Sequence, residues 1–429
     1  MTETMRTRTN PFFLMAGLYL TVGLLAVAGK LAVETGAVDA LPRLRWLTIH
    51  FVTIGAMTQA LFGALPNLVA SVGDGQPVPS RGRWIQWVTL NASYPFVLVG
   101  MATGSSTTAV AGATGVLVAL ALLVVSVYRT NLESAAGRNE GLVRYYAVAP
   151  WFLVVGIFAA FGMLLGVHGP GGYFGSIEAH VHANVWGFLA LVAAGTLLAI
   201  VPKMAGSELR YPRLKPVTFW GVTLGATGLV AGPWLAVNAL TMAGLGVYVV
   251  GTLALLANLV GTWRLGGCTT DARFAHVIGA YVWLVFPVPW APLVLLVPEA
   301  VPATGIEAAA IEGLVFGWML QLAMGLLPSV VVALRETPAD LRSSIGESAH
   351  RPSWLGVGAV NAGMVALWLT AFPTFGGVEG ALTLGGYALV GLAWLGFLPG
   401  LWRALLDRSE GGRRGDAGVV TPDGEQVLD

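Results

Sequence analysis

The amino-acid sequence predicts an all-α protein that crosses a membrane about twelve times. Hydrophobic residues make up 56% of its 429 residues and charged residues only 10%, whereas a soluble domain carries about 25% charged residues. Apolar runs of about 20 residues, long enough to cross a hydrocarbon core of about 30 Å, recur from Phe12 to Arg403. The predicted spans are residues 12–30, 46–70, 84–103, 107–128, 147–167, 179–202, 216–236, 240–263, 274–297, 308–334, 354–373 and 381–403.

Cysteine content and charge exclude several classes of site and partner. Cys268 is the only cysteine, so an intramolecular disulfide and the Cys₄, Cys₃His and Cys₂His₂ metal sites are excluded. The formal net charge is +1, and no soluble basic domain is present that could hold a nucleic acid. We therefore expect the lipid bilayer, and no nucleic acid, as a partner.

The distribution of basic residues predicts the orientation of the chain. With the amino terminus inside, only Lys30, Arg43 and Arg45 of the 23 lysines and arginines fall on the outer side. Cytoplasmic loops carry an excess of positive charge, so both termini of this multi-pass plasma-membrane protein are predicted to be cytoplasmic. The membrane domain then covers residues 1–408, and the polar segment 409–429 is predicted to be a disordered cytoplasmic tail.

Residue spacing predicts an internal repeat of three four-helix units. In the second, sixth and tenth spans, an ionisable side chain is followed by glycines five and thirteen residues later; these side chains are His50, His182 and Glu312. They are separated by 132 and 130 residues. Chance is the alternative explanation, because 57 glycines match many short patterns and helix packing favours small residues. The predicted units are about 1–135, 136–268 and 269–408.

Histidines at the outer ends of two spans are candidate ligands for a metal cofactor. An ionisable side chain at membrane depth is a functional candidate, and imidazole is a common ligand of haem iron. His50 and His182 are therefore candidate haem ligands, and His180 is a third. His180 and His182 lie about 200° apart around a helix, so they could serve two centres but not the same iron. Each could instead only hydrogen-bond a neighbouring helix.

The remaining histidines are not expected to be ligands. His168 precedes a glycine-rich stretch and is predicted to be a solvated loop residue. His276 and His350 are predicted to lie on the cytoplasmic side, away from the other four.

Other charged residues on the outer side could support such a site. Arg43 and Arg45 would suit the carboxylates of a haem through charge-assisted hydrogen bonds, or they could anchor the helix at the interface. Glu312 stands where the other two units carry histidine. It could carry a proton or replace a ligand, or it could be placed by the helix dipole alone.

Two motifs resemble the catalytic subunit of haem-copper oxidases and nitric oxide reductases. They are the run that ends in His50 and the His180-Val-His182-Ala-Asn-Val-Trp-Gly run of the sixth span. The resemblance implies twelve helices in a pseudo-threefold arrangement and an H-x-H pair that serves two haems. It also implies an electron donor such as a quinol, a cytochrome or a cupredoxin, and a small partner subunit.

The chain departs from this family in its ligand positions. In the family the H-x-H pair lies on the tenth helix, whereas here it lies on the sixth, and no histidine occurs between His182 and His276 to complete the family's copper site. We therefore expect a b-type haem but no copper. The expected function is electron transfer, or binding and turnover of nitric oxide or oxygen by an oxidoreductase without the usual copper. The competing prediction is a twelve-helix secondary transporter without haem, although transporters are usually built from two halves.

Overall fold

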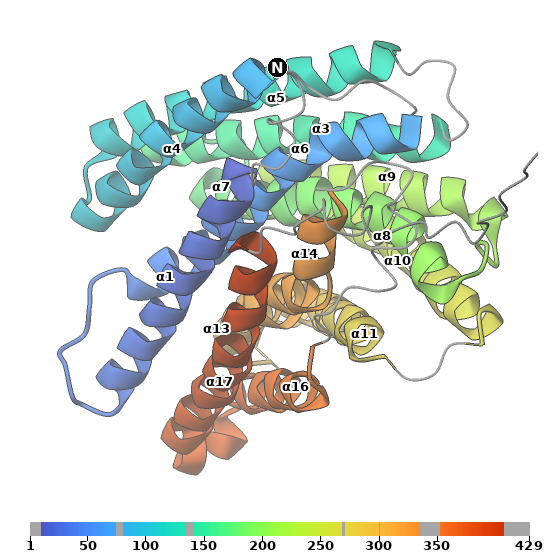
Figure 1. The fold of residues 1–429 in the computed structure, drawn as a ribbon. Coiled ribbons are helices and arrows are strands. Elements are labelled where there is room, and N and C mark those ends of the chain that lie inside the picture. Colours follow the sequence, from blue (N-terminus) through green and yellow to red (C-terminus); the bar gives the residue numbers. More distant parts are fainter. Residues whose placement is uncertain are drawn as a thin grey trace, which may run out of the picture.

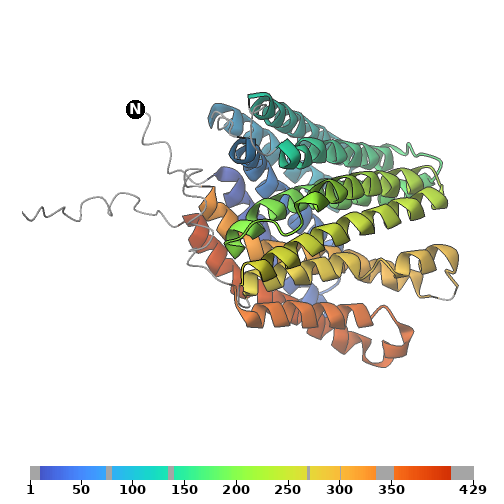
Figure 2. The same cartoon turned by 90° about the vertical axis from the view of Figure 1, so that its right-hand side faces the viewer.

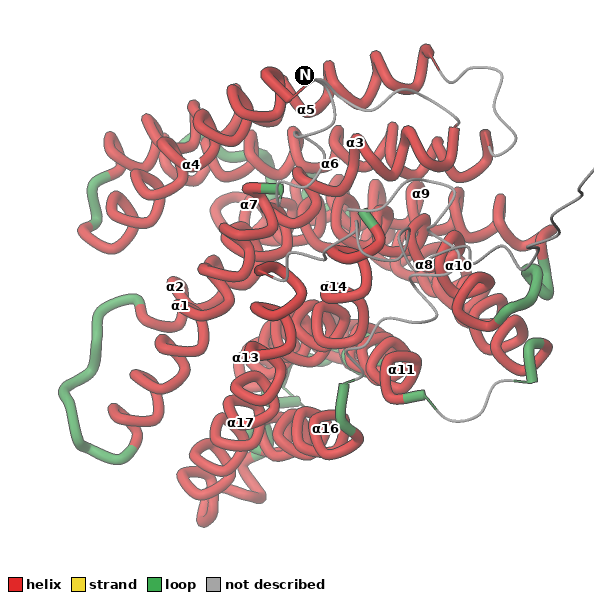
Figure 3. The backbone as a smooth tube through the Cα atoms, in the orientation of Figure 1, coloured by secondary structure: helices red, strands yellow, loops and turns green. Residues whose placement is uncertain are grey.

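The computed structural model describes residues 10–73, 80–133, 140–267, 271–299, 301–334 and 352–406. Within these ranges every regular element is a helix and no strand occurs (Figure 1, Figure 3). The all-α prediction is confirmed for this part of the chain. The predicted tail at 409–429, Cys268 and His350 lie outside the described residues.

The helices follow one another in the order of the predicted spans. The first third contains α1 (Pro11–Glu34), α2 (Leu44–His50), η1 (Phe51–Thr58), α3 (Gln59–Gly73), α4 (Ser80–Thr103) and α5 (Ser106–Glu133). The second contains α6 (Glu140–Leu165), α7 (Gly172–His182), η2 (Ala183–Leu189), α8 (Ala190–Ala205), η3 (Pro212–Leu214), α9 (Lys215–Trp234) and α10 (Asn238–Leu265). The last contains α11 (Ala272–Val285), α12 (Trp290–Leu296), α13 (Ala303–Glu312), η4 (Gly313–Leu320), α14 (Gln321–Ala333), α16 (Trp354–Leu369), η5 (Pro373–Val378) and α17 (Glu379–Leu406).

Nine helical segments of the described residues are long and apolar enough to cross a membrane. They lie side by side with their axes roughly aligned (Figure 2). Three predicted spans are not among the nine: α4 and α9 do not qualify, and α16 is an apolar helix of only 16 residues. The membrane character is thus supported, whereas the number twelve stays a prediction.

Three of the spans are interrupted by π-helical segments and form the centre of the bundle. The π-helices η1, η2 and η4 connect α2 to α3, α7 to α8 and α13 to α14. These spans are the most buried of the nine, with 56%, 78% and 83% of an 18-residue stretch inside the protein. The π-helices begin directly after His50, His182 and Glu312. Since π-helices occur often at functional sites, this position favours a role for these residues.

Close glycine contacts join each interrupted span to the preceding span. A Cβ added at the glycine five residues after His50, His182 or Glu312 would collide with the base of an aromatic ring; the pairs are Gly55 with Tyr19, Gly187 with Phe152, and Gly317 with Trp283. The three aromatic residues are themselves separated by 133 and 131 residues. The glycine spacing noted in the sequence therefore coincides with one type of packing contact, used three times.

The ninth predicted span differs from the prediction. Residues 274–297 were expected to form one continuous helix, but α11 ends at Val285 and α12 begins at Trp290. Pro287 and Pro289 lie between them. A proline removes a backbone donor and its ring collides with the preceding turn, which explains why the helix is broken there.

Candidate functional site

Three polar clusters lie around α2, α7 and α13, the short helices that precede the π-helices. We call them the histidine pair (His50 and His180), the His182 cluster (His182, Glu178 and Glu307) and the Glu312 cluster (Glu312, Tyr387, Arg45, Lys30 and Glu34). Each cluster includes side chains from at least two spans that are distant in sequence. The interrupted helices thus bring polar groups together where the rest of the bundle is mostly apolar.

The ring of His50 is held in one orientation by its own helix. It stacks on Trp46 with ring centroids 3.7 Å apart and an interplanar angle of 21°. Its Nδ1 lies 2.8 Å from the carbonyl oxygen of Trp46. A carbonyl only accepts hydrogen bonds, so Nδ1–H donates and the lone pair of the neutral ring is on Nε2. This leaves Nε2 as a ligand or proton acceptor.

His180 is held in the same way, but by a neighbouring helix. Its Nδ1 lies 2.8 Å from the carbonyl oxygen of Gly156 on α6, so Nδ1–H again donates and Nε2 keeps its lone pair. The amide nitrogen of Asn184 lies 3.1 Å from the same Nδ1, while its Oδ1 is buried without a hydrogen-bond partner in the described residues. Because Nδ1–H of His180 donates to Gly156, the Asn184 amide would interact favourably with the same atom through its oxygen rather than its nitrogen.

The structure brings His180 rather than His182 to His50. His50 and His180 lie near each other, although they come from α2 and α7. His182 lies on another side of α7, close to the backbone of Leu229 on α9. The two histidines, predicted to lie about 200° apart around the helix, therefore face different neighbours.

The His182 cluster combines one histidine with two carboxylates. The Nε2 of His182 lies 3.7 Å from Oε2 of Glu178, and its ring centroid lies 4.6 Å from that of Trp186. Glu178 in turn lies close enough to Glu307 on α13 for their charges to interact. This cluster thus links α7 to α13.

The Glu312 cluster joins α13 to α1, α2 and α17. The hydroxyl of Tyr387 donates a hydrogen bond to the Glu312 carboxylate. Arg45 approaches the same carboxylate, with Nε 4.0 Å from Oε1, and its Nη2 donates to the carbonyl oxygen of Ala308 at 3.1 Å. Lys30 lies 4.6 Å above the centroid of the Tyr387 ring. Glu312 thus has a hydroxyl donor and two basic side chains near it, and Glu34 is the one like charge of the cluster.

The structure places the two outer arginines apart from the histidine pair. Arg45 is bound to α13, on the side of Glu312. Arg43 is exposed, precedes α2 with a left-handed backbone (φ 56°), and forms no ion pair within the described residues. Neither contacts His50 or His180 through a hydrogen bond or ion pair in the described part of the chain.

The other described histidines lie away from the three clusters. His168 is exposed in the loop between α6 and α7, with Nδ1 3.3 Å from the hydroxyl of Ser176. His276 is only 1% exposed and packs near Gly325 and Gly356. The topology predicts His276 near the cytoplasmic end of its span, and no local pattern indicates that its side chain is buried.

Several residues of the clusters were not predicted from the sequence. Trp46 and Asn184 lie four residues from His50 and His180, and helical i,i+4 spacing could have identified them. Gly156 and Tyr387 carry no local signal, because their contacts depend on how distant helices pack. In the described part of the chain, no group of three or more His, Cys, Asp or Glu side chains could hold a metal ion by itself. Neither a protein-family model nor a curated protein sequence matches this chain.

Proposed function

We propose that this protein is a membrane electron-transfer protein that holds a b-type haem between His50 and His180. The observation that carries the proposal is the matched state of the two rings: each Nδ1 faces a backbone carbonyl at 2.8 Å, which leaves the lone pair of each neutral ring on Nε2, the atom that would bind iron. Histidine ligands of metals almost always donate their other ring N–H in this way. The nearness of the two side chains supports a haem shared between them.

The residues around the pair would orient the ligands. The carbonyl groups of Trp46 and Gly156 fix the tautomer and raise the basicity of Nε2, while the Trp46 ring restricts rotation of His50. A haem with two histidine ligands supplies one-electron exchange, at a potential set by hydrogen bonding and burial. Both axial positions would be taken, which favours electron transfer over turnover of nitric oxide or oxygen at this site.

The proposal extends to the surroundings of the protein. It includes twelve spans in three related units, an oxidase-like arrangement without copper, a plasma-membrane location and cytoplasmic termini. An electron donor such as a quinol, cytochrome or cupredoxin, with or without a small partner subunit, would complete the function. The recurring glycine–aromatic contacts support the related units. The predicted distribution of lysines and arginines, three outside and twenty inside out of 23 in total, supports the orientation.

Visible spectroscopy of the purified protein and its histidine variants tests the proposal. The wild type should show a Soret band and a sharp reduced α band. His50→Ala and His180→Ala should each abolish this low-spin spectrum, because each removes one axial ligand. His182→Ala is the matched control two residues away and should leave the spectrum unchanged. A colourless wild type from haem-replete cells, or loss of the spectrum only in His182→Ala, would contradict the assignment.

A proton-coupled transporter is the second candidate function. It is favoured by the Glu312 cluster, in which a carboxylate meets a tyrosine and two basic residues beside an interrupted helix. Ionisable groups inside a membrane often mark proton pathways. If the protein is colourless, proton-driven uptake into proteoliposomes that is lost in Glu312→Gln would support transport.

A further inference from the structure

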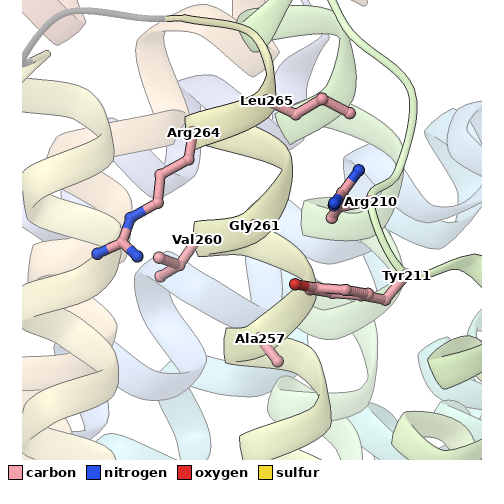
Figure 4. Close-up of a pocket in the computed structure, with 7 residues that line it drawn as sticks. All are labelled: Arg210, Tyr211, Ala257, Val260, Gly261, Arg264 and Leu265. Carbon is pink, nitrogen blue, oxygen red and sulfur yellow. The ribbon is translucent and has the colours of Figure 1, made fainter.

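A groove of about 500 Å³ opens at the carboxyl-terminal end of α10, far from the three clusters. It is lined by Arg210 and Tyr211, which precede η3, and by Val260, Gly261 and Arg264 of α10 (Figure 4). The two arginines lie on either side of the stripe that Gly261 and Val260 form on α10 (Figure 4). The groove therefore combines an apolar floor with a cation on each flank.

Buried polar residues hold the wall of this groove in place. The backbone N–H of Tyr211 donates to Oδ1 of Asn258 at 2.9 Å, and that of Arg210 donates to Oγ1 of Thr262 at 3.1 Å. Asn258 and Thr262 are both fully buried. A Cβ at Gly261 would lie 2.7 Å from the Tyr211 ring, so the close approach of the ring requires glycine there. The positions of both arginine backbones are thus fixed by the fold.

The two guanidinium groups can bind an anion: the Arg210 guanidinium lies over the Tyr211 ring, with Cζ 5.8 Å from its centroid, a contact that leaves its N–H groups as donors. Both arginines are exposed, and neither forms an ion pair with any residue that the structure describes. Guanidinium groups bind phosphate through paired charge-assisted hydrogen bonds. The flank charges therefore favour a phosphate group as the ligand.

A second, apolar groove lies between α9 and α10. It has a volume of about 320 Å³ and is lined by Trp220 and Leu224 of α9 and by Val247 and Val250 of α10. Trp220 is 53% exposed and Val250 57%. Residues 250, 257, 261 and 264 follow helical i,i+3 and i,i+4 spacing, so the two grooves occupy one face of α10. Polar and apolar grooves thus follow one another in line.

We propose that this face binds one anionic phospholipid, with its phosphate between Arg210 and Arg264 and an acyl chain along α9 and α10. The apolar continuation distinguishes a lipid from free phosphate, because inorganic phosphate would leave that groove unused. The charged end is the one predicted to be cytoplasmic, where anionic lipids attract basic side chains. This proposal is independent of the haem proposal, since none of its residues belongs to the three clusters.

Native mass spectrometry of the full-length protein in detergent, with added dioleoyl phosphatidylglycerol or phosphatidylcholine, tests the proposal. The wild type should retain one phosphatidylglycerol in preference to phosphatidylcholine. The double variant Arg210→Gln/Arg264→Gln should lose about 10- to 30-fold in affinity for phosphatidylglycerol, from the loss of two basic contacts. The matched control is Arg129→Gln/Arg213→Gln, which removes two exposed arginines outside the groove; it should keep wild-type affinity.

Three results would overturn the proposal. An equal loss in both double variants would show that surface charge alone attracts the lipid. Unchanged affinity in Arg210→Gln/Arg264→Gln would exclude the groove. Full displacement of the bound lipid by millimolar inorganic phosphate would assign the arginines to free phosphate instead.

Discussion

Replacing Gly187 by alanine should destabilise the protein, because the new methyl group would enter space occupied by Phe152. An added Cβ would meet Cβ, Cγ and Cδ1 of that residue, atoms close to the backbone that cannot swing aside. Inserting a methyl group into a packed core costs about 1–3 kcal/mol, while the helix preference of alanine over glycine returns at most about 1 kcal/mol. We expect a net loss of about 1–2 kcal/mol in the free energy of unfolding, measured by denaturant titration in detergent micelles.

The same change at the related glycines tests whether the contact recurs. Gly55→Ala and Gly317→Ala should cost a similar amount, because the colliding atoms are again the base of an aromatic ring. Gly358→Ala and Gly385→Ala are matched controls, since nothing lies within 4 Å of an added Cβ there; they should be neutral or stabilising by up to about 1 kcal/mol. If Gly187→Ala were as stable as the controls, the packing argument would be refuted.

Two further predictions concern the Glu312 cluster and the orientation. Tyr387→Phe should lower the free energy of unfolding by about 1.5–3 kcal/mol, because it removes a hydrogen bond to a carboxylate; the exposed Tyr173→Phe should have little effect, and equal stability of the two variants would argue against the contact. Cys268, in a loop predicted to be cytoplasmic, should react with a membrane-impermeant maleimide in inside-out vesicles but not in intact cells, and Ala40→Cys in a Cys268→Ser background should show the opposite pattern. Labelling of Cys268 from outside would reverse the orientation.

Hydropathy and spacing predicted the parts of the fold that depend on local sequence. Apolar runs identified the helices, because a helix in a bilayer must satisfy its backbone internally whatever its neighbours are. The glycine spacing coincided with real contacts, because an aromatic ring packs against the backbone at Gly55, Gly187 and Gly317 and leaves no room for a larger side chain there. The break at Pro287 was missed only because the flanking residues are apolar enough to hide it in a hydropathy window.

Features that depend on helix rotation could not be predicted in the same way. The π-helices η1, η2 and η4 have no distinct composition, yet each changes the direction in which the following side chains point. The contacts of Gly156 with His180 and of Tyr387 with Glu312 join helices separated by 24 and 75 residues. Nothing in the sequence near either residue indicates which neighbour its helix meets.

The proposed pairing of His50 with His180 is consistent with the threefold repeat that the spacing predicts. In a threefold arrangement, equivalent residues of the three units point in equivalent directions, so each points into a different site and none points at another. His50 points toward the second unit, His182 lies in the cluster that reaches Glu307 of the third, and Glu312 meets Arg45 of the first.

A site with two histidines must then combine non-equivalent positions. His180 provides such a position. It lies two residues before His182, the equivalent of His50, and about 200° from it around the helix axis, so it faces His50 instead of the His182 cluster. The glycine spacing that pointed to His182 predicts equivalent positions in the three units, so it could not point to His180 as the proposed partner of His50. On this argument the His182 cluster and the Glu312 cluster need no second histidine. Their carboxylates, and Arg45 of the Glu312 cluster, would then serve in proton transfer or in holding the helices together.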